Sequence, residues 1–419
     1  MLDDIKNRAA ATSIFTAQTP PKIAFISSMV CYPWGGSEEL WAGSAMELLK
    51  SGYRVVANVK YWPKPARQLS ALRESGCELR MRQPAGRIWW HLNRLSRGLI
   101  PRPLDSRWLD EVRPDLVVLS LGIHQDGADW MLACARRKIP YTVLVQAASE
   151  NIWPSDEGIK ALREGYQGAA RVFFVAVGNR DVVETQIGCS LSQSELIFNP
   201  FGVPYDSDPT WPNEQTGYRL ACVGRLDPSS KGQDLLFKVL RQPKWRERDV
   251  SVALFGQGSN GDALRVLRDH YQLSNVSLGG FKNGVLGIWE DHHALVLPSR
   301  HEGLPIAVVE AMLCQRPCIV TDVAGNAEAV QDGLSGFVAE APTVRALDDA
   351  MERGWRRRHE WKEMGAEAGR RIRSLVPRDP AAVFASRLKA LVVEEQQPTN
   401  EIGIRDSDNR VVGSKSAYV

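Results

Sequence analysis

The sequence predicts two doubly wound α/β domains joined by a proline-rich hinge. Three observations lead to this fold class. The chain has 419 residues, which is too long for one ordinary hydrophobic core. Short apolar strands alternate with helical patterns along most of it, as in parallel sheets with right-handed crossovers. The alternation stops near residue 200, where NPFGVPYDSDPTWPNEQTG carries four prolines and no hydrophobic periodicity, and then it restarts.

The first domain is predicted over residues 22–200. KIAFISSMV is its first expected strand, and SEELWAGSAMELLKSG follows with helical spacing and a glycine stop. Further strands are expected at YRVVANVK, DLVVLSLG, IPYTVLVQ and ARVFFVAVG, with a helix at DGADWMLACARRK. The hinge or linker then covers residues 201–216.

The second domain is predicted over residues 217–380. Its expected strands are YRLACVGRL, VSVALFG, VSLGGF, HALVLPS and PCIVTD, and its expected helices include GQDLLFKVLRQ and DALRVLRDHYQL. A C-terminal helix is expected at 381–395, followed by a polar, disordered tail at 396–419. Ligands of such folds bind at the carboxyl ends of the strands, so the cleft between the domains is the predicted site.

Composition narrows the class of protein. Hydrophobic residues make up 44% and charged residues 24%, which is typical of a soluble globular protein. The net charge of +3 is too small for a general nucleic-acid binder. The N-terminal segment has no apolar h-region, and no apolar run is long enough to span a membrane. We therefore expect a cytoplasmic protein that does not bind nucleic acid.

The seven cysteines are odd in number and scattered along the chain. Cys314 and Cys318 are spaced i, i+4, which is not a common zinc or redox spacing. Thiols buried in the core, in a reducing compartment, are the better interpretation, and no cofactor is predicted.

A first candidate site lies in VGRLDPSSKGQDLLFKVL. A strand ends there, a loop carries Arg225 and Lys231, and a helix begins. Two cations beside a helix N-terminus form an anion site that suits a diphosphate. The alternative is a solvated loop with ordinary surface basic residues.

A second candidate site is SRHEGLPIAVVEAM, where Glu310 stands in an apolar helix and Glu302 precedes a Gly-Leu-Pro turn. A buried carboxylate needs a partner, and Arg316 lies six positions on, where helical geometry turns it away. Gly303 lets backbone approach a ligand, and Pro305 suits a first helical turn. Both carboxylates are predicted to accept hydrogen bonds from sugar hydroxyls, unless they are structural groups with protein partners.

Two glycine-rich loops complete the candidates. GQGSNG, residues 256–261, matches the dinucleotide fingerprint, but no acidic residue follows at the end of the next strand, which argues against nicotinamide binding. In WGGSEE, Gly35 and Gly36 would let the backbone close on an acceptor or on a phosphate, or else form a tight turn.

These residues carry a resemblance to a known family. The segments VGRLDPSSKGQDLL, FGQGSNGDALRVL, LPSRHEGLPIAVVEAM and RPCIVTDVAGNAEAVQDGLSGFV resemble the second domain of the family-four glycosyltransferases. The resemblance is continuous from about Ala221 to Val338, and Glu302 and Glu310 match the family's two glutamates separated by seven residues. The first domain is similar more loosely, through KIAFISS, the Gly-Gly loop and NPFGVP.

The resemblance implies a GT-B fold and a retaining, metal-independent transferase. Arg225 and Lys231 match the family's diphosphate-binding cations. Glu302 matches the carboxylate near the donor sugar, and Glu310 the one that holds the nucleotide ribose. The loop that meets the phosphates in the family corresponds here to Gly303, Leu304 and Pro305.

Fixed cations agree with the chemistry, because charge develops on the leaving diphosphate when a glycosyl phosphate bond breaks. No metal is then required. The Asp-x-Asp at Asp206 and Asp208 lies in the hinge rather than at a strand end, so it is interpreted as linker polarity.

The chain departs from the family at three places. Many relatives carry histidines where this chain has Ser120, or a neighbour, and Gln146. His124 lies four residues late and is an uncertain substitute, since a lone histidine is often structural. Relatives also place glycine at the position of Gln315, which changes a helix exit.

Acceptor binding is assigned to the first domain. Residues 60–113 hold twelve Lys and Arg against five Asp and Glu, with Trp62, Trp89, Trp90 and Trp108 among them. This mixture suits an anionic lipid surface or a phosphate-bearing acceptor, and hence a peripheral membrane contact. The alternative is a solvated face with snorkelling arginines.

The function predicted from these features is a cytoplasmic retaining glycosyltransferase of polysaccharide or glycolipid assembly. It would move a hexosyl-type sugar from a nucleotide-sugar donor to the hydroxyl of a saccharide or lipid-linked acceptor. A rival hypothesis is a non-catalytic protein of the same fold that binds nucleotide-sugar and regulates or scaffolds a partner.

Overall fold

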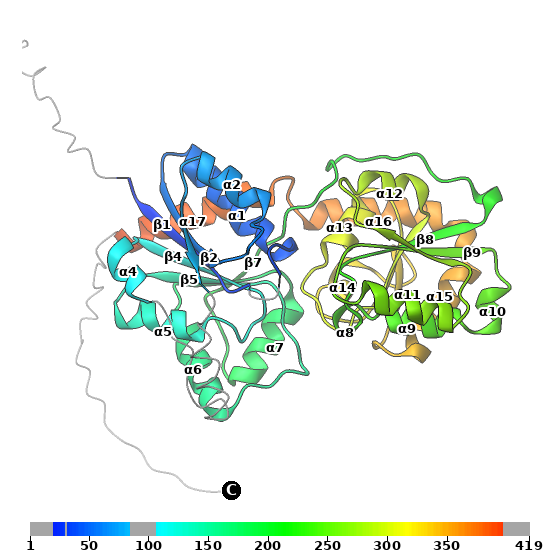
Figure 1. Ribbon diagram of the computed structural model, residues 1–419, viewed down its shortest axis with the longest axis horizontal. Helices are drawn as coiled ribbons and strands as arrows, with labels where there is room; N and C mark the ends of the chain where they lie inside the picture. Colours follow the sequence, from blue (N-terminus) through cyan, green and yellow to red (C-terminus); the bar gives the residue numbers. More distant parts are fainter. Residues whose placement is uncertain (1–19, 30–31, 84–105, 397–419) are drawn as a thin grey trace, which may run out of the picture.

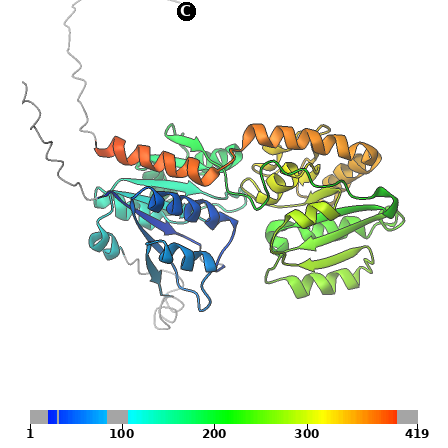
Figure 2. The ribbon, with the colours of Figure 1, turned by 90° about the horizontal axis from the view of Figure 1, so that it is seen from above.

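Two α/β domains lie side by side in the computed structural model, which describes residues 20–29, 32–83 and 106–396 (Figure 1). The predicted disordered tail lies outside these residues, apart from Gln396 at the end of the last helix. Each domain has a parallel sheet at its centre with helices on both faces (Figure 2). The prediction of two doubly wound α/β domains is confirmed.

The first sheet has the strand order β3-β2-β1-β4-β5-β6-β7 within the described residues, and every pairing is parallel. Its strands are β1 Lys22–Ser27, β2 Arg54–Lys60, β3 Glu78–Arg82, β4 Leu116–Leu121, β5 Tyr141–Val145, β6 Arg171–Phe174 and β7 Ser194–Leu196. Its helices are α1 Gly36–Lys50, α2 Arg67–Glu74, α4 Arg107–Val112, α5 Ala128–Arg136, α6 Asp156–Gln167 and α7 Val177–Ile187.

The second sheet has the order β10-β9-β8-β11-β12-β13, again parallel throughout. Its strands are β8 Tyr218–Val223, β9 Val250–Phe255, β10 Val276–Gly280, β11 Ala294–Leu297, β12 Cys318–Thr321 and β13 Gly336–Ala339. Its helices are α8 Pro228–Lys231, α9 Gln233–Leu240, α10 Pro243–Arg246, α11 Gly261–His270, α12 Leu286–Asp291, α13 Ile306–Leu313, α14 Asn326–Ala329, α15 Val344–Arg356 and α16 Trp361–Leu375. Short 3₁₀ turns lie at Glu214–Thr216 and Arg358–Glu360.

Both sheets reverse their strand order beside their first strand. In the first sheet the reversal lies between β1 and β4, and in the second between β8 and β11. Loops that leave neighbouring strands in opposite directions at such a point open a crevice at the carboxyl ends of the strands. The topology therefore predicts one ligand-binding edge in each domain.

The C-terminal helix, α17 Pro380–Gln396, belongs to the first domain in space. It crosses back from the second domain and packs on α1 (Figure 2). Phe384 and Leu388 are fully buried in the same core as Phe25 and Trp41. The chain thus connects the two domains twice, once through the linker and once through the segment before α17.

The linker at 201–216 is not a free connection, since it packs on the second domain. Val203 is buried with side chains of α13, and the Tyr205 hydroxyl donates to the carbonyl of Arg373 on α16, at 2.7 Å. Arg373 in turn donates to the carbonyls of Tyr205 and Ser207. Any hinge motion must therefore begin before this packed stretch.

Several described cysteines are buried and all of them are free thiols. Burial raises the pKa of Cys314 to about 12 and holds the pKa of Cys318 above its usual range, so both stay protonated at neutral pH. Within the described residues, no helix is long and apolar enough to cross a membrane.

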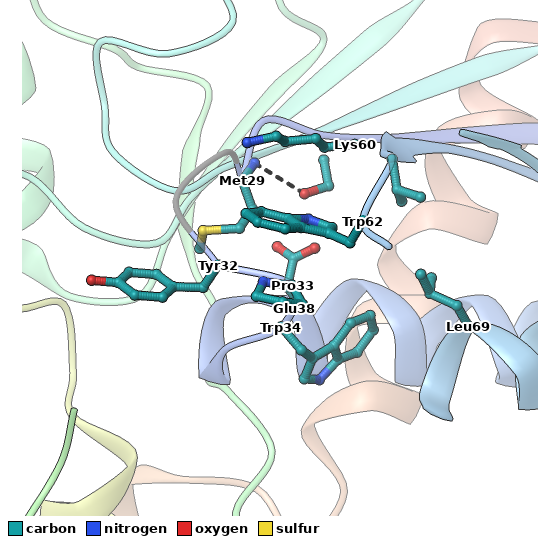
Figure 3. Close-up of a pocket in the computed structure, with 10 residues that line it drawn as sticks. Met29, Tyr32, Pro33, Trp34, Glu38, Lys60, Trp62 and Leu69 are labelled. Atoms are coloured by element: carbon teal, nitrogen blue, oxygen red, sulfur yellow. Dashed lines mark hydrogen bonds between the residues drawn. The ribbon is translucent and has the colours of Figure 1, made fainter. Parts of the chain in front are cut away.

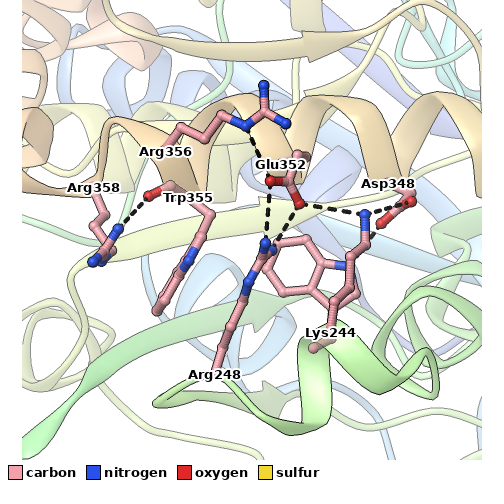
Figure 4. A network of polar contacts seen from close by, with 8 residues as sticks. Lys244, Arg248, Asp348, Glu352, Trp355, Arg356 and Arg358 are labelled. Carbon is pink, nitrogen blue, oxygen red and sulfur yellow. Dashed lines mark hydrogen bonds and ion pairs between the residues drawn. The ribbon is translucent and has the colours of Figure 1, made fainter.

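A network of charges ties α10 to α15 in the second domain (Figure 4). Glu352 accepts hydrogen bonds from Arg248 at 2.8 and 3.1 Å and from Lys244 at 3.3 Å. Arg248 also lies over the rings of Trp245 and Trp355. The Arg248 hydrogen bonds, with help from Lys244, lower the pKa of Glu352 to about 2.

Glu352→Gln should lower the stability of the second domain by about 1–2 kcal/mol at neutral pH. This value lies between the typical contribution of an exposed ion pair and that of a hydrogen bond to a charged group. Because the folded pKa is depressed, this contribution is present above the ordinary pKa of about 4.5 and is lost as pH falls towards 2. Melting temperatures of both proteins across this range test it. Glu367→Gln, which removes an exposed partner of Arg370, is the control and should change nothing. An equal difference at pH 7 and pH 3 would contradict the role given to the carboxylate.

Candidate functional site

The two candidate cations lie at the switch point of the second sheet. β8 ends at Val223, and the loop that follows carries Arg225 before α8 ends at Lys231. The Arg225 guanidinium carbon lies 3.9 Å from the ring centroid of Tyr32, a residue of the first domain. The Arg225 guanidinium also lies close to Gly35, since a Cβ on that glycine would be 3.7 Å from an Arg225 nitrogen. Arg225 therefore points across to the other domain.

Lys231 is held by Glu302. Its ammonium lies 2.5 Å from a Glu302 carboxylate oxygen, and the Ser299 hydroxyl donates to the same oxygen at 2.6 Å. The Glu302 side chain is only 7% exposed. Gly232 makes this turn possible, because its φ is +66° and a Cβ would lie 1.9 Å from the carbonyl oxygen of Pro298. A lysine ammonium has three protons, so this pairing leaves it able to bind an anion as well.

Glu310 is 5% exposed in the middle of α13. One of its oxygens accepts a hydrogen bond from the backbone N–H of Gly202 in the linker, at 2.7 Å. Burial raises the pKa of Glu310 to about 7, and the Gly202 hydrogen bond opposes that shift. Glu310 therefore has a protein partner, as the structural alternative expected. Arg316, as predicted, turns away and donates instead to backbone carbonyls such as those of Trp289 and His292.

The Gly-Leu-Pro turn lies against the first domain. A Cβ on Gly303 would be 2.3 Å from the carbonyl oxygen of Gln146, so no other residue fits without moving the two domains apart. Pro305 is the N-cap of α13 rather than part of its first turn, and Leu304 packs beside the buried face of that helix. Close packing between the domains therefore explains why position 303 is a glycine, in addition to the ligand contact that the sequence suggests.

Gly35 and Gly36 face the same turn from the first domain. Gly35 is the N-cap of α1, which has no side-chain cap of its own. A Cβ on Gly36 would lie 2.6 Å from Cδ1 of Ile306, the first residue of α13. The two glycine positions therefore bring the N-termini of α1 and α13 close together beside Arg225.

The GQGSNG loop packs closely against the backbone of the loop that carries Arg225. A Cβ on Gly256 would lie 1.9 Å from the carbonyl oxygen of Gly224, and one on Gly258 would lie 2.2 Å from that of Leu226. The Leu226 N–H also donates to the carbonyl of Gln257 at 3.0 Å. These glycines allow close backbone packing, which explains the motif without a dinucleotide.

Three groups at the start of α7 contact the second domain. The backbone N–H groups of Val177 and Gly178 donate to the two carboxylate oxygens of Glu328, at 2.9 and 2.8 Å. The Asn179 amide donates to the carbonyl of Glu302 at 3.1 Å. A carboxylate at a helix N-terminus is favourable, because it satisfies free N–H groups at the positive end of the helix dipole. We call this set of contacts the α7 clasp.

Glu328→Gln should loosen the clasp, because Gln keeps the shape but removes the charge that the helix N-terminus favours. We expect a more open average arrangement of the domains, seen as a larger radius of gyration in small-angle X-ray scattering. A loss of about 1–2 kcal/mol between the domains is enough to change their populations about tenfold. Glu164→Gln, on the exposed side of α6, is the control. Superimposable curves for wild type and Glu328→Gln would contradict the clasp.

His124 is a core residue and is only 2% exposed. Its Nε2 lies 2.7 Å from the Gln186 side-chain oxygen, and burial lowers its pKa. Gln146 accepts a hydrogen bond from Asn199 at 2.8 Å, and the buried Ser120 hydroxyl has no hydrogen-bond partner among the described residues. The structure therefore favours the structural interpretation of His124.

The Asp-x-Asp stretch has protein partners in the linker. Asp206 pairs with Arg378, and Asp208 accepts a hydrogen bond from Gln315 at 2.6 Å. Gln315 has a φ of 57°, in the left-handed region where glycine is the usual residue. Within the described parts of the chain, no three His, Cys, Asp or Glu side chains come together as a metal site would require.

The aromatic residues of the basic segment divide into three groups. Trp108 is 4% exposed in the core of the first domain, so its prediction as part of a membrane surface is wrong. Trp89 and Trp90 lie outside the described residues. Trp62 lines a pocket at the carboxyl ends of β1 and β2, with the Lys60 ammonium 4.1 Å from its ring centroid.

Sequence reasoning missed Tyr32, Asn179 and Glu328. The first two belong to the first domain and touch the second, and no periodicity shows such a contact. A weak signal existed for Glu328. The first turn of α7 follows Ala176 and has no Ser, Thr, Asp or Asn at its N-cap, so its N–H groups needed an acceptor from elsewhere.

Comparison with known proteins identifies the second domain. Residues 217–356 match the family model described as Glycosyl transferases group 1.

The second domain is a group 1 glycosyl transferase domain.

Two curated relatives match much the same segment. The chain is 30% identical over 145 residues to the UDP-Gal:alpha-D-GlcNAc-diphosphoundecaprenol alpha-1,3-galactosyltransferase of Escherichia coli, covering 33% of this chain and 37% of that protein. It is 26% identical over 139 residues to the poly(ribitol-phosphate) alpha-N-acetylglucosaminyltransferase of Staphylococcus aureus (strain COL), covering 33% and 28%. The matched segment thus spans about a third of the length of these relatives.

Solved structures extend the likeness to both domains. HepE of Anabaena in complex with UDP-glucose has a TM-score of 0.67 at 16% identity, covering 88% of this chain and 99% of that one. A variant of TarM from S. aureus, in complex with Fondaparinux, alpha-GlcNAc-glycerol and UDP, has a TM-score of 0.67 at 12% identity, covering 89% and 99%. At these identities the likeness shows the fold, and the group 1 domain is the C-terminal half of a GT-B chain.

Proposed function

We propose that this protein is a retaining, metal-independent glycosyltransferase. It moves a hexosyl-type sugar from a nucleotide-sugar to an acceptor hydroxyl in polysaccharide or glycolipid assembly. The observation that carries this proposal is the position of Arg225 and of the Lys231–Glu302 pair. They lie at the switch point of the group 1 domain, where Arg225 also contacts Tyr32 and lies close to Gly35 of the first domain.

The two cations suit the leaving group of such a reaction. When the bond between the sugar and the diphosphate breaks, negative charge grows on the diphosphate oxygens, and fixed positive groups stabilise that charge. Arg225 offers a planar guanidinium for bidentate contact, and Lys231 adds a compact ammonium. Glu302, which Ser299 holds by a hydrogen bond, fixes the ammonium in place, so little reorganisation is needed as charge develops.

The two glutamates suit the two halves of the donor. Glu302 lies beside Lys231 and so near the sugar that the diphosphate would carry. Glu310 keeps one oxygen on Gly202, and its carboxylate is assigned to the ribose hydroxyls of the nucleotide. The Gly303–Pro305 turn would then lie over the phosphates, between the N-termini of α13 and α1.

Relatives and neighbours guide the choice of substrates to test. The E. coli relative is named for UDP-Gal and a diphosphoundecaprenol-linked acceptor, one structural neighbour contains UDP-glucose, and another contains UDP. The test is therefore a panel of nucleotide-sugars that begins with UDP-hexoses, with release of the nucleoside diphosphate as readout. Release or transfer supports the enzyme, and the anomeric configuration of the product, read by NMR, tests retention. Tight binding of a nucleotide-sugar without turnover would favour a non-catalytic binding protein instead.

Activity should be largely unchanged in saturating EDTA. Arg225, Lys231 and the N-terminus of α13 supply the positive field that a divalent cation would otherwise provide. The measurement is nucleoside diphosphate release with and without chelator. Loss of activity that Mg²⁺ or Mn²⁺ restores would overturn metal independence and return attention to Asp206 and Asp208.

A further inference from the structure

Arg225 is the less firmly held of the two candidate cations. Its backbone is fixed, because its carbonyl accepts hydrogen bonds from the Gln233 side-chain amide at 2.7 Å and from the Asp227 N–H at 2.9 Å. Among the described residues, its guanidinium forms no hydrogen bond or ion pair of the kind that joins Lys231 to Glu302. The position of this charge therefore depends on what else the side chain contacts.

The contact that remains is the ring of Tyr32. The guanidinium carbon lies 3.9 Å from the ring centroid, and both side chains are half-buried. Tyr32 lies between β1 and α1 and directly precedes Pro33, and a residue before a proline is largely restricted to extended backbone. Its ring points away from Glu38 and Trp62 (Figure 3). A first-domain side chain with little backbone freedom thus contacts a second-domain cation.

The kind of contact determines what Arg225 can still bind. A carboxylate partner would offset much of the guanidinium charge and would occupy some of its N–H groups. An aromatic face attracts the cation through its quadrupole, but it carries no net charge and takes none of the N–H donors at the guanidinium edge. The donors of Arg225 therefore stay available to a diphosphate, which an arginine can bind in a bidentate manner.

The ring also limits the motion of a long side chain. An arginine loses much rotamer entropy when it is fixed in one position. Groups that stabilise developing charge act best when they are already in place, because no reorganisation is then needed during the reaction. The first domain thus supplies an aromatic face that preorganises a charge of the second domain.

We propose that Tyr32 is a positioning residue, which holds the Arg225 guanidinium by its face and leaves the N–H edge to the diphosphate. This inference rests on the proposed function and adds a first-domain residue to the donor site. Because Tyr32 and Arg225 belong to different domains, the donor site is complete only when the two domains lie together as they do in this structure.

Kinetic comparison of Tyr32→Leu with Tyr32→Phe tests the role of the ring. Leucine keeps apolar bulk but has no aromatic face. In Tyr32→Leu, kcat/KM for a UDP-sugar should fall about fivefold and UDP affinity about threefold, as expected for the loss of one cation–π contact. Phenylalanine retains the face, so Tyr32→Phe should keep at least about half of the wild-type kcat/KM. Melting temperatures of all variants are measured alongside.

A double-mutant cycle shows whether Tyr32 acts through Arg225. In the Arg225→Ala background, Tyr32→Leu should change kcat/KM and UDP affinity by less than about twofold, because the cation that the ring positions is gone. A purely structural tyrosine would have the same effect in both backgrounds. Trp153→Leu, which removes an exposed aromatic ring elsewhere in the first domain, is the control and should behave like the wild type.

The outcomes separate this inference from the proposed function. If the wild type turns over a nucleotide-sugar, an unchanged rate in Tyr32→Leu overturns the role of Tyr32 and leaves the transferase standing. Equal losses in Tyr32→Leu and Tyr32→Phe would assign the effect to the hydroxyl, and equal effects of Tyr32→Leu with and without Arg225 would assign it to another part of the protein. Either result overturns the inference.

A wild type that binds UDP without any turnover overturns the transferase, and the cycle is then measured on UDP affinity alone. Weaker UDP binding in Tyr32→Leu that depends on Arg225 still supports the positioning role. Unchanged UDP binding in that variant overturns it.

Discussion

Replacing Arg225 by alanine should lower turnover of a nucleotide-sugar about 100- to 1000-fold, the usual cost of removing one group that stabilises developing charge. The folded protein should change little. Within the described residues, the side-chain contact recorded for Arg225 is the Tyr32 ring, and a cation–π contact of this kind is worth about 0.5–1 kcal/mol. The measurement is kcat together with the melting temperature of the same sample.

The control for this variant is Arg265→Ala on α11, which removes an exposed arginine that pairs with Asp262. It should leave both turnover and melting temperature unchanged. A near-normal rate in Arg225→Ala with an intact fold would refute the assignment of Arg225 to the diphosphate.

Lys231 is a less suitable residue for this test. If Lys231 only bound the diphosphate, as the sequence predicts, Lys231→Ala would lower turnover far more than stability. The structure pairs Lys231 with a Glu302 carboxylate that is 7% exposed, and removing one partner of a buried pair leaves the other charge uncompensated. A fall in both quantities is now expected for Lys231→Ala, so Arg225 separates chemistry from folding more cleanly.

Glu310→Gln should weaken binding of a nucleoside diphosphate and of its sugar conjugate equally, by about 10- to 100-fold. The range follows from about 1.5–3 kcal/mol for hydrogen bonds to a charged group. Gln retains an oxygen for the Gly202 N–H, so the linker contact survives. Calorimetric titration with UDP and with a UDP-sugar measures both affinities, with Glu363→Gln on the exposed side of α16 as control.

The same variant has a defined pH dependence without ligand. The folded pKa of Glu310 is raised to about 7 by burial, so its contribution to stability is fully present below the ordinary pKa of about 4.5. That contribution is lost as pH rises through 7. The melting temperature of Glu310→Gln, relative to that of the wild type, should therefore increase between pH 5 and pH 8. A variant that loses stability at pH 8 and keeps its nucleotide affinity would show that Glu310 is purely structural.

The central strands were predictable because they are apolar on both faces. β1, β4, β5, β8, β11 and β12 all lie within segments expected as strands, as parallel strands covered by helices should. The two edge strands of the first sheet were not predicted. β3 has the sequence ELRMR, and none of its residues is fully buried, while β7 is only three residues long. Neither contains enough apolar residues to be recognised.

One apolar run was predicted as a strand that is longer than the observed one. ARVFFVAVG was expected as a single strand, but β6 ends at Phe174 and α7 begins at Val177. Hydrophobicity alone does not separate a buried strand from the buried start of a helix. The Glu328 carboxylate, which satisfies the first N–H groups of α7, comes from a residue 150 positions away, and local sequence cannot indicate it.

The candidate site shows a similar division between features that the local sequence indicates and contacts that depend on packing. Arg225, Lys231 and Glu302 were found because a strand end, a glycine and a helix start fix their neighbourhood within one domain. The direct pairing of Lys231 with Glu302 depends on the fold of that domain and was not foreseen. The contact of Tyr32 with Arg225 depends on how the first domain meets the second, and the linker contact to Glu310 depends on packing that proline content alone does not reveal.

A crystal structure of the protein with a bound nucleoside diphosphate, beginning with UDP, would test the donor site at atomic detail. We expect the phosphate oxygens within hydrogen-bond distance of Arg225 and Lys231, and the ribose hydroxyls on the Glu310 carboxylate. A nucleotide bound instead on the GQGSNG loop away from Arg225, or in the first domain, would contradict the proposed donor site.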